Sequence, residues 1–251
     1  MNNPTMVNNV SQIFISDSNE TLPPLLKEAV QTVKMSFERC NYTLYNEETL
    51  KDLINDGIGN EALIAYKSLN AYACKADLGR YCIAYLRGGW YIDISIKVLK
   101  RIEFGKYVDF LGFIDQGAGA FLPYSLAYPI QCSLFYSNPR NPIFAKAIDL
   151  VIENCKTKNY GVSPLCITAT GVLGRALAHV GQKDTHILGH FIPLTPNHKQ
   201  KNRSYVLPSG DIMAIHKDAW FPNCEGGDLS SLGAIGTNNY YKMAESRTIY
   251  K

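Results

Sequence analysis

Four polar residues in one stretch of this sequence have the types and the spacing that ligand binding requires. Asp77 and Arg80 are one helical turn apart in a segment expected to be helical, so both side chains project from the same helix face. Asp93 and Ser95 follow toward the end of an apolar strand, where α/β sheets bind their ligands. We therefore expect the two carboxylates, the guanidinium and the hydroxyl to converge on one crevice.

Each pair also has an ordinary structural interpretation. Asp77 and Arg80 could form an exposed ion pair on a helix, which contributes a few tenths of a kcal/mol to stability. Asp93 could be a carboxylate at a strand edge or in a turn. That second interpretation is the weaker one, because an aspartate between two isoleucines in a central strand is costly to bury without a partner.

The segments that must position these residues alternate between strand and helix. Predicted strands cover residues 11–16, 42–45, 90–96, 108–115, 131–136, 185–194, 204–207 and 211–216. Predicted helices cover residues 25–37, 47–54, 61–87 with a break near Asn70, 143–154 and 172–179. Asn46 is the expected N-cap of the second helix, and Gly88-Gly89 ends the third helical region. Because strands and helices alternate early and hairpin-like strands dominate late, we expect an α/β fold with a mixed sheet.

The composition is that of an ordinary globular domain with nearly balanced charge. The apolar fraction of 46% and the charged fraction of 19% exclude disorder, collagen and coiled coil. Lys and Arg number 25 against 22 Asp and Glu, a balance too small for a nucleic-acid binder that relies on phosphate neutralisation. We expect one domain over residues 1–251, with a flexible N-terminus over about 1–10 and a C-terminal loop or tail over about 222–251.

The spacing of the cysteines and the length of the apolar runs indicate the cellular compartment in which the protein is expected. The seven cysteines are dispersed without a C-x-x-C pair, which is typical of reduced thiols in the cytosol. The polar N-terminus lacks the blocks of a signal peptide, and no run approaches the roughly 18 apolar residues of a spanning helix. We expect a cytoplasmic protein, with attachment to the inner membrane surface as the alternative.

The stretch between Asp77 and Asp93 resembles the signature of the DXD sugar transferases of glycosyltransferase family 32, and more distantly the glucosylating clostridial toxins. The positions that carry this resemblance are Asp77-x-x-Arg80-Tyr81, Tyr85-Leu86, Gly88-Gly89 and Tyr91-Ile92-Asp93. Weaker likenesses occur in the same order at residues 11–16, 42–50, 137–142, 169–171, 214–216 and Trp220. The resemblance thus covers about residues 11–221 and is most specific at 77–93.

The resemblance implies a single GT-A catalytic domain, Rossmann-like, with a mixed central sheet flanked by helices. It also implies a nucleotide-sugar donor such as a UDP- or GDP-hexose, transfer with retention of configuration, and a divalent cation, manganese or magnesium. The chemistry is consistent with these residue types, because a hard cation held by carboxylates can neutralise the charge that develops on a diphosphate leaving group.

Carried over position by position, the resemblance assigns Asp77 and Arg80 to the hydroxyls of the donor sugar. Asp93 would meet the ribose, the sugar or metal-bound water, and His216 would approach the metal or the diphosphate. Trp220 would shape the closing loop. The implied catalytic residues are Asp93, Asp77 and Arg80; the implied donor-binding residues are these three with Ser95, Gly89 and Trp220; the implied metal ligands are Asp93, Ser95 and His216.

Ser95 is a departure from the family pattern, because the second carboxylate of the motif normally binds the metal directly. A neutral hydroxyl there weakens the expected cation site. His216, Glu225 or Asp228 could supply the charge instead, the metal could be weakly held, or Lys and Arg could neutralise the diphosphate. An inactive relative that only binds the donor is the fourth alternative.

Two later segments have open interpretations. Lys199, Lys201 and Arg203 form a basic cluster that is a solvated loop, a diphosphate clamp or a contact for anionic lipid. Gly226-Gly227 lies in an acidic loop that could close over the donor or be a surface turn.

We therefore expect a retaining glycosyltransferase that moves a hexose to a glycan or lipid-linked acceptor, such as a capsule or lipopolysaccharide precursor. An effector-type transferase that glycosylates a protein is one alternative. A nucleotide-sugar-binding protein without transfer activity is another, because of Ser95.

Overall fold

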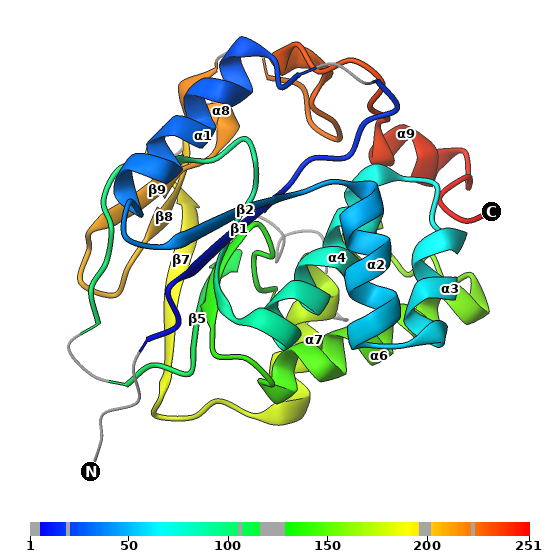
Figure 1. Cartoon of the computed structure of the whole chain (residues 1–251), viewed down its shortest axis with the longest axis horizontal. Helices are drawn as coiled ribbons and strands as arrows, with labels where there is room; N and C mark the ends of the chain where they lie inside the picture. The colour runs from blue at the N-terminus through cyan, green and yellow to red at the C-terminus, as the bar shows by residue number, and fades with distance from the viewer. Residues whose placement is uncertain (1–5, 19–20, 105–106, 116–128, 196–201, 222–223) are drawn as a thin grey trace.

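The computed structural model describes residues 6–18, 21–104, 107–115, 129–195, 202–221 and 224–251. In this part of the chain one curled sheet of nine strands runs through the molecule, with helices on both sides (Figure 1). The strand order across the sheet is β2 (Asn41–Tyr45), β1 (Asn9–Ile13), β3 (Gly89–Ile92), β6 (Leu134–Ser137), β5 (Phe110–Asp115), β7 (His186–Pro193), β8 (Arg203–Val206), β9 (Ile212–Ile215) and β4 (Lys97–Val98).

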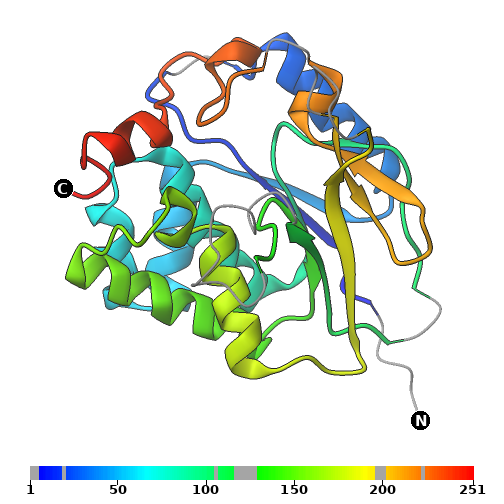
Figure 2. The ribbon, with the colours of Figure 1, turned by 180° about the vertical axis from the view of Figure 1, so that it is seen from behind.

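The sheet is mixed, as the sequence predicts. Strands β2, β1 and β3 are parallel, with Val10 of β1 opposite Trp90 of β3, and β5 is parallel to β7. Strand β6 is antiparallel to both of its neighbours, and β7, β8, β9 and β4 form an antiparallel run that Figure 2 shows from behind. The carboxyl ends of β1 and β3 therefore lie side by side at one edge, where α/β sheets bind ligands.

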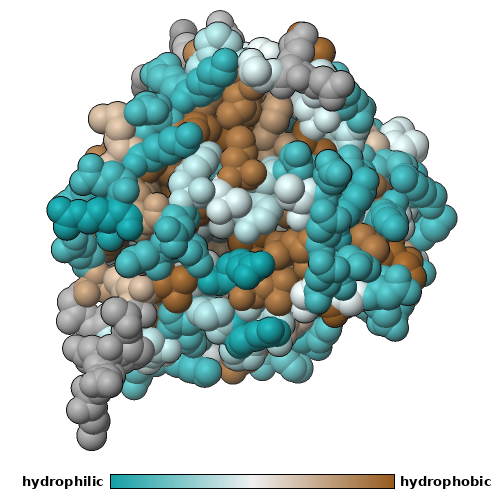
Figure 3. All heavy atoms as spheres, viewed as in Figure 1, coloured by the Kyte–Doolittle hydropathy of each residue, from teal (hydrophilic) through white to brown (hydrophobic). Residues whose placement is uncertain are grey.

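Helices cover both faces of the sheet. The helices are α1 (Pro24–Ser36), α2 (Glu47–Gly57), α3 (Asn60–Ser68), α4 (Tyr72–Arg87), α6 (Pro142–Thr157), α7 (Thr170–Val180), α8 (Lys217–Trp220) and α9 (Tyr240–Glu245), with 3-10 turns η1 (Pro164–Cys166) and η2 (Ser230–Leu232). Helices α2, α3, α4, α6 and α7 group on one side, and α1 and α8 lie on the other, beside β8 and β9 (Figures 1 and 2). Apolar side chains on this view of the surface lie largely in recesses between hydrophilic ones (Figure 3).

Local signals set several of these boundaries as predicted. The Asn46 side chain accepts from the Thr49 backbone N–H in a capping box that begins α2. The helical region breaks between α3 and α4, on either side of Asn70, and α4 ends at Gly88, whose φ is +62°. All seven cysteines are free thiols, as their spacing predicts. Within the described ranges, no helix is both long and apolar enough to cross a membrane.

The strand predicted over residues 90–96 is wrong in its second half. Strand β3 ends at Ile92, and the next four residues form a turn in which the Ile96 N–H donates to the Asp93 carbonyl at 3.0 Å. The apolar alternation continues through the turn because Ile94 packs against Leu26 and Val30 of α1 instead of the sheet. Asp93 and Ser95 therefore lie in a turn at the carboxyl end of β3.

The residues from 224 to the C-terminus pack onto the body of the protein. The side chains of Leu232 and Ile249 are fully buried. The Gly236 carbonyl accepts from the Asp17 N–H at 2.9 Å, and the N–H of Lys251 donates to the carbonyl of Ser68 at 2.8 Å. This segment, expected to be a loop or tail, contains η2 and α9 and is held near its middle and at its C-terminal residue.

A substitution at Gly89 tests how closely the strands β1 and β3 approach each other. Its φ is +89°, and a Cβ at this position would lie 2.4 Å from the carbonyl oxygen of Asn9 on β1. Gly210 has nearly the same φ of +88° with nothing within 4 Å of a Cβ, so Gly210→Ala is a matched control for backbone strain. We expect Gly89→Ala to lower the free energy of unfolding by about 2 kcal/mol more than Gly210→Ala, measured by urea unfolding. Equal losses would contradict the close packing of the two strands.

Candidate functional site

A buried guanidinium joins two carboxylates at the carboxyl end of β3. Arg80 Nη2 lies 3.2 Å from Asp77 Oδ1 and 3.1 Å from Asp93 Oδ1. Arg80 is 4% exposed and Asp77 6%, so the exposed ion pair weighed for these two residues is excluded. The side chain of Asp93 is 30% exposed and is the member of the cluster most open to solvent. The sequence prediction that these three residues converge is confirmed.

Hydrogen bonds with neighbouring groups hold the other polar atoms of the cluster in place. Thr168 Oγ1 donates to Asp77 Oδ2 at 2.6 Å, and Arg80 Nη1 donates to the Cys132 carbonyl at 2.9 Å. The Tyr91 hydroxyl donates to Asp93 Oδ1 at 2.7 Å, and its ring lies under the guanidinium. Sequence reasoning missed Thr168 and Cys132, because each lies more than 50 residues along the chain from its partner on α4.

Burial and charge act in opposite directions on this cluster. Burial raises the pKa of the Asp77 carboxyl, while the Arg80 guanidinium and the Thr168 hydroxyl act to lower it. Burial alone would lower the pKa of Arg80, but the neighbouring anionic groups, Asp93 first, leave that pKa raised. Burial also raises the pKa of the Cys132 thiol, which stays protonated and donates to Asp77 Oδ1. The cluster thus keeps a fixed positive charge between its carboxylates.

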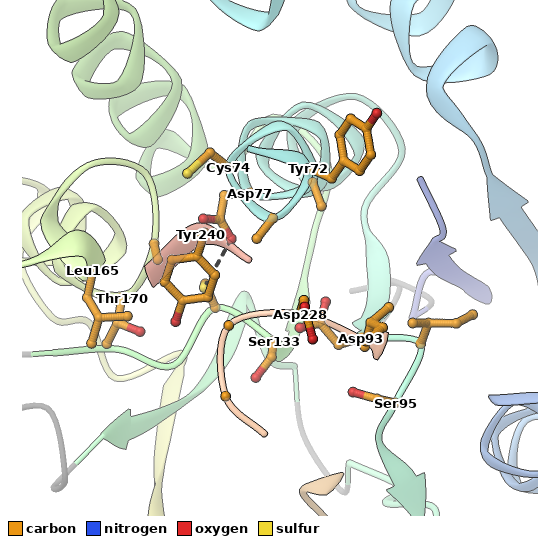
Figure 4. Close-up of a pocket in the computed structure, with 18 of the residues that line it drawn as sticks. Tyr72, Cys74, Asp77, Asp93, Ser95, Ser133, Leu165, Thr170, Asp228 and Tyr240 are labelled. Atoms are coloured by element: carbon orange, nitrogen blue, oxygen red, sulfur yellow. Dashed lines mark hydrogen bonds between the residues drawn. The ribbon is translucent and has the colours of Figure 1, made fainter. Parts of the chain in front are cut away.

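A pocket of about 260 Å³ opens above the cluster (Figure 4). Asp77 from α4, Asp93 and Ser95 from the turn after β3, and Thr170 at the start of α7 contribute to its lining. Tyr240 of α9 also lines the pocket, and in Figure 4 its ring lies near Asp77 and Thr170. The volume lies near the lower limit of ligand pockets, which hold about 300–1,000 Å³. Helix α9, which the sequence did not predict to be part of the site, thus contributes to the lining of the pocket.

The wall next to Ser95 is made by α8 and the strands before it. Trp220 Nε1 donates to the Ser95 carbonyl at 3.1 Å and ties α8 to the turn. His216 lines the pocket, and its Nδ1 accepts from the backbone N–H of Asp218 at 3.4 Å and lies 3.1 Å from its carboxylate. Burial lowers the pKa of His216, although Asp218 acts to raise it, so the imidazole is held toward its neutral form. Arg203 on β8 lines the pocket and is paired with Asp218 at 2.6 Å.

Not every residue implied by the resemblance reaches this pocket. Trp220 acts on it through Ser95 and does not line it, and Gly89 lies at the opposite end of β3 from Asp93. The positive φ and the close approach of β1 account for a glycine there without any ligand contact. Lys199 and Lys201 of the basic cluster lie outside the described residues.

The donor set for a divalent cation is incomplete. Asp93 Oδ1 already accepts from Arg80 and Tyr91, Ser95 offers only a neutral hydroxyl, and Asp218 occupies Nδ1 of His216, so that this histidine could offer only its Nε2. Among the residues with a described placement, no group of three or more His, Cys, Asp or Glu could hold a metal ion. Hard cations require about six oxygen ligands, so these side chains do not make a complete metal site by themselves.

The sequence matches no protein-family profile and no curated protein sequence. Among solved structures the fold is similar to that of the PaToxG glycosyltransferase, with a TM-score of 0.52 and 18% sequence identity over 70% of each chain. At this identity the likeness shows a shared fold. It confirms the mixed α/β class expected from the sequence, while the resemblance to family 32 stays a prediction.

Arg80→Met tests the role of the buried guanidinium at nearly constant side-chain volume. Because Asp77 and Asp93 would lose their counter-charge, we expect the free energy of unfolding at about pH 7 to fall by about 3–5 kcal/mol. Adding Asp77→Asn should restore part of this loss. Urea unfolding measures both, and Lys100→Met, which breaks the exposed pair with Asp211, should cost far less because solvent screens that pair. A loss at Arg80 no larger than at Lys100 would contradict this interpretation.

Ser95→Asp tests whether a missing carboxylate limits cation binding. The new anionic oxygen beside Asp93 should tighten Mn²⁺ binding in the absence of nucleotide by about tenfold or more, because affinity follows the number of charged ligands. Ser95→Asn has the same size without the charge and is the matched control. Calorimetric Mn²⁺ titrations, with and without a nucleoside diphosphate, make the measurement. If the wild type already binds Mn²⁺ tightly and Ser95→Asp changes nothing, the ligands lie elsewhere.

Proposed function

We propose that this chain is a glycosyltransferase that moves a hexose from a nucleotide-sugar donor to an acceptor with retention of configuration. The observation that carries the proposal is the cluster of Asp77, Arg80 and Asp93 in a pocket at the carboxyl end of β3. Two carboxylates that accept and one guanidinium that donates, with Arg80 Nη2 3.2 Å from Asp77 and 3.1 Å from Asp93, can bind adjacent hydroxyls of a sugar. A fold shared with a glycosyltransferase supports this assignment.

In this reaction the bond between the sugar C1 and the diphosphate oxygen breaks, and the electron pair leaves with the diphosphate. The acceptor oxygen forms the new bond to C1 and gives its proton to the departing diphosphate. Asp77 and Arg80 hold the sugar in one orientation, because their own rotamers are locked by Thr168 and Cys132. Asp93, the more exposed carboxylate, contacts the hydroxyls on the side of the sugar or ribose that faces the opening.

The first choice of acceptor is a glycan or lipid-linked precursor of a capsule or lipopolysaccharide, reached in the cytoplasm or at the inner membrane surface. A protein acceptor, as in an effector-type transferase, is equally compatible with the shared fold. Because Ser95 stands where the family pattern has a second carboxylate, a donor-binding protein without transfer activity is a third candidate. Hydrolysis of the donor separates the two enzymes from the binder, and acceptor assays separate the enzymes from each other.

A thermal-shift screen of UDP- and GDP-hexoses, with and without Mn²⁺, tests the proposal first. A ligand that binds only the native state raises the melting temperature by mass action. A shift with at least one nucleotide sugar supports the donor class, and its absence for all of them under both conditions overturns it.

Asp93→Asn tests the catalytic assignment. The substitution leaves Arg80 paired with Asp77, so the fold should remain, while donor hydrolysis should fall by about a hundredfold or more, as when one polar group at the reacting centre is removed. The assay follows release of the nucleoside diphosphate, with the melting temperature as the check on folding. Asp211→Asn, in the exposed turn between β8 and β9, should keep full activity. Unchanged turnover in folded Asp93→Asn would overturn the assignment.

A further inference from the structure

Lys217 places a buried ammonium in the wall of the pocket. It is the first residue of α8, directly after His216, and it is 8% exposed. It lines the pocket together with Ser95 and the loop residues Gly227 and Asp228. Trp220, three residues further along the same helix, bonds to the Ser95 carbonyl, so this end of α8 is fixed against the turn that follows β3.

The partners of this ammonium are neutral. Lys217 Nζ donates to the carbonyl oxygen of Glu225 at 3.1 Å and to the carbonyl oxygen of Asp228. No carboxylate in the described ranges forms an ion pair with it. The other buried cations differ in this respect: Lys75 is paired with Glu47 at 2.7 Å, and Arg80 with two aspartates.

A buried cation without a counter-ion is costly, by several kcal/mol per ion even after relaxation of the surroundings. Two carbonyl dipoles offset part of this cost but leave the net charge in place. The nearby guanidinium of Arg203 does not share this property, because Asp218 neutralises it. Among the described cations that line the pocket, Lys217 is therefore the one without an ion-pair partner within 4.0 Å, and an anion in the pocket would supply one.

We propose that Lys217 pairs with the diphosphate of the donor, so that a nucleoside diphosphate binds this site without a divalent cation. This inference rests on the proposed function. An ammonium has three N–H donors; two are directed to Glu225 and Asp228, and the third is left for a phosphate oxygen. The charge stands on the wall next to Ser95, where the donor set for a cation is incomplete.

Lys217 also has a structural role, which the test must separate from the electrostatic one. Its two carbonyl bonds hold the loop from Glu225 to Asp228 over the pocket. Loss of that contact would weaken every ligand that fills the pocket, charged or not. Loss of the positive charge would weaken only ligands that carry phosphate.

The experiment compares uridine with UDP, and guanosine with GDP, by calorimetry in excess EDTA. Lys217→Met keeps the apolar stem and removes the charge. We expect the wild type to bind a diphosphate in EDTA, and Lys217→Met to weaken binding of the diphosphate about ten- to a hundredfold more than it weakens binding of the nucleoside. Lys100→Met, at an exposed ion pair with Asp211, should change neither affinity.

Two results would overturn the inference while the proposed function stands: diphosphate binding that requires Mn²⁺ and ignores Lys217→Met, or equal losses for nucleoside and diphosphate. If no nucleotide or nucleotide sugar binds with or without Mn²⁺, the proposed function fails as well.

Discussion

The bridge that Arg80 makes between Asp77 and Asp93 is the interaction on which the rest of the site depends. It joins α4 to the turn after β3, and its third contact, to the Cys132 carbonyl, adds the segment before β6. The next residue, Tyr81, donates its hydroxyl to the carbonyls of Thr168 and Ala169. One turn of α4 thus fixes three separate pieces of chain, because buried charges must be satisfied before the surrounding segments can pack.

The pocket has chemically different sides. Its floor offers carboxylates whose charge a guanidinium partly cancels, which suits neutral hydroxyl groups. The wall formed by α8 offers an ammonium bonded only to carbonyls, which suits an anion. A ligand with an uncharged ring at one end and phosphates in the middle would therefore bind in one direction only, because reversing it would place its anionic part against Asp77 and Asp93.

Much of the fold follows from local signals in the sequence, and the site follows only in part. Asn46 and Gly88 mark helix ends through their own chemistry, so these boundaries were predictable. The turn after Ile92 was not predictable from the sequence. A buried turn and a buried strand give the same apolar alternation when Ile94 packs on a helix. The spacing of Asp77 and Arg80 placed them on one helix face but could not say that this face would be covered. No local signal marks Lys217 or Tyr240, since their roles arise from contacts with distant segments.

The contribution of residues 226–241 to the pocket has a consequence for how the protein is made. Translation reaches Tyr240 only after all nine strands, α4 and the residues of the cluster around Arg80 have been synthesised. A nascent chain that has not yet reached this point lacks one wall of the pocket and leaves the floor open to water. The pocket is therefore complete only once α9 has been synthesised and has docked, and a fragment that stops before Tyr240 lacks the wall that this helix supplies.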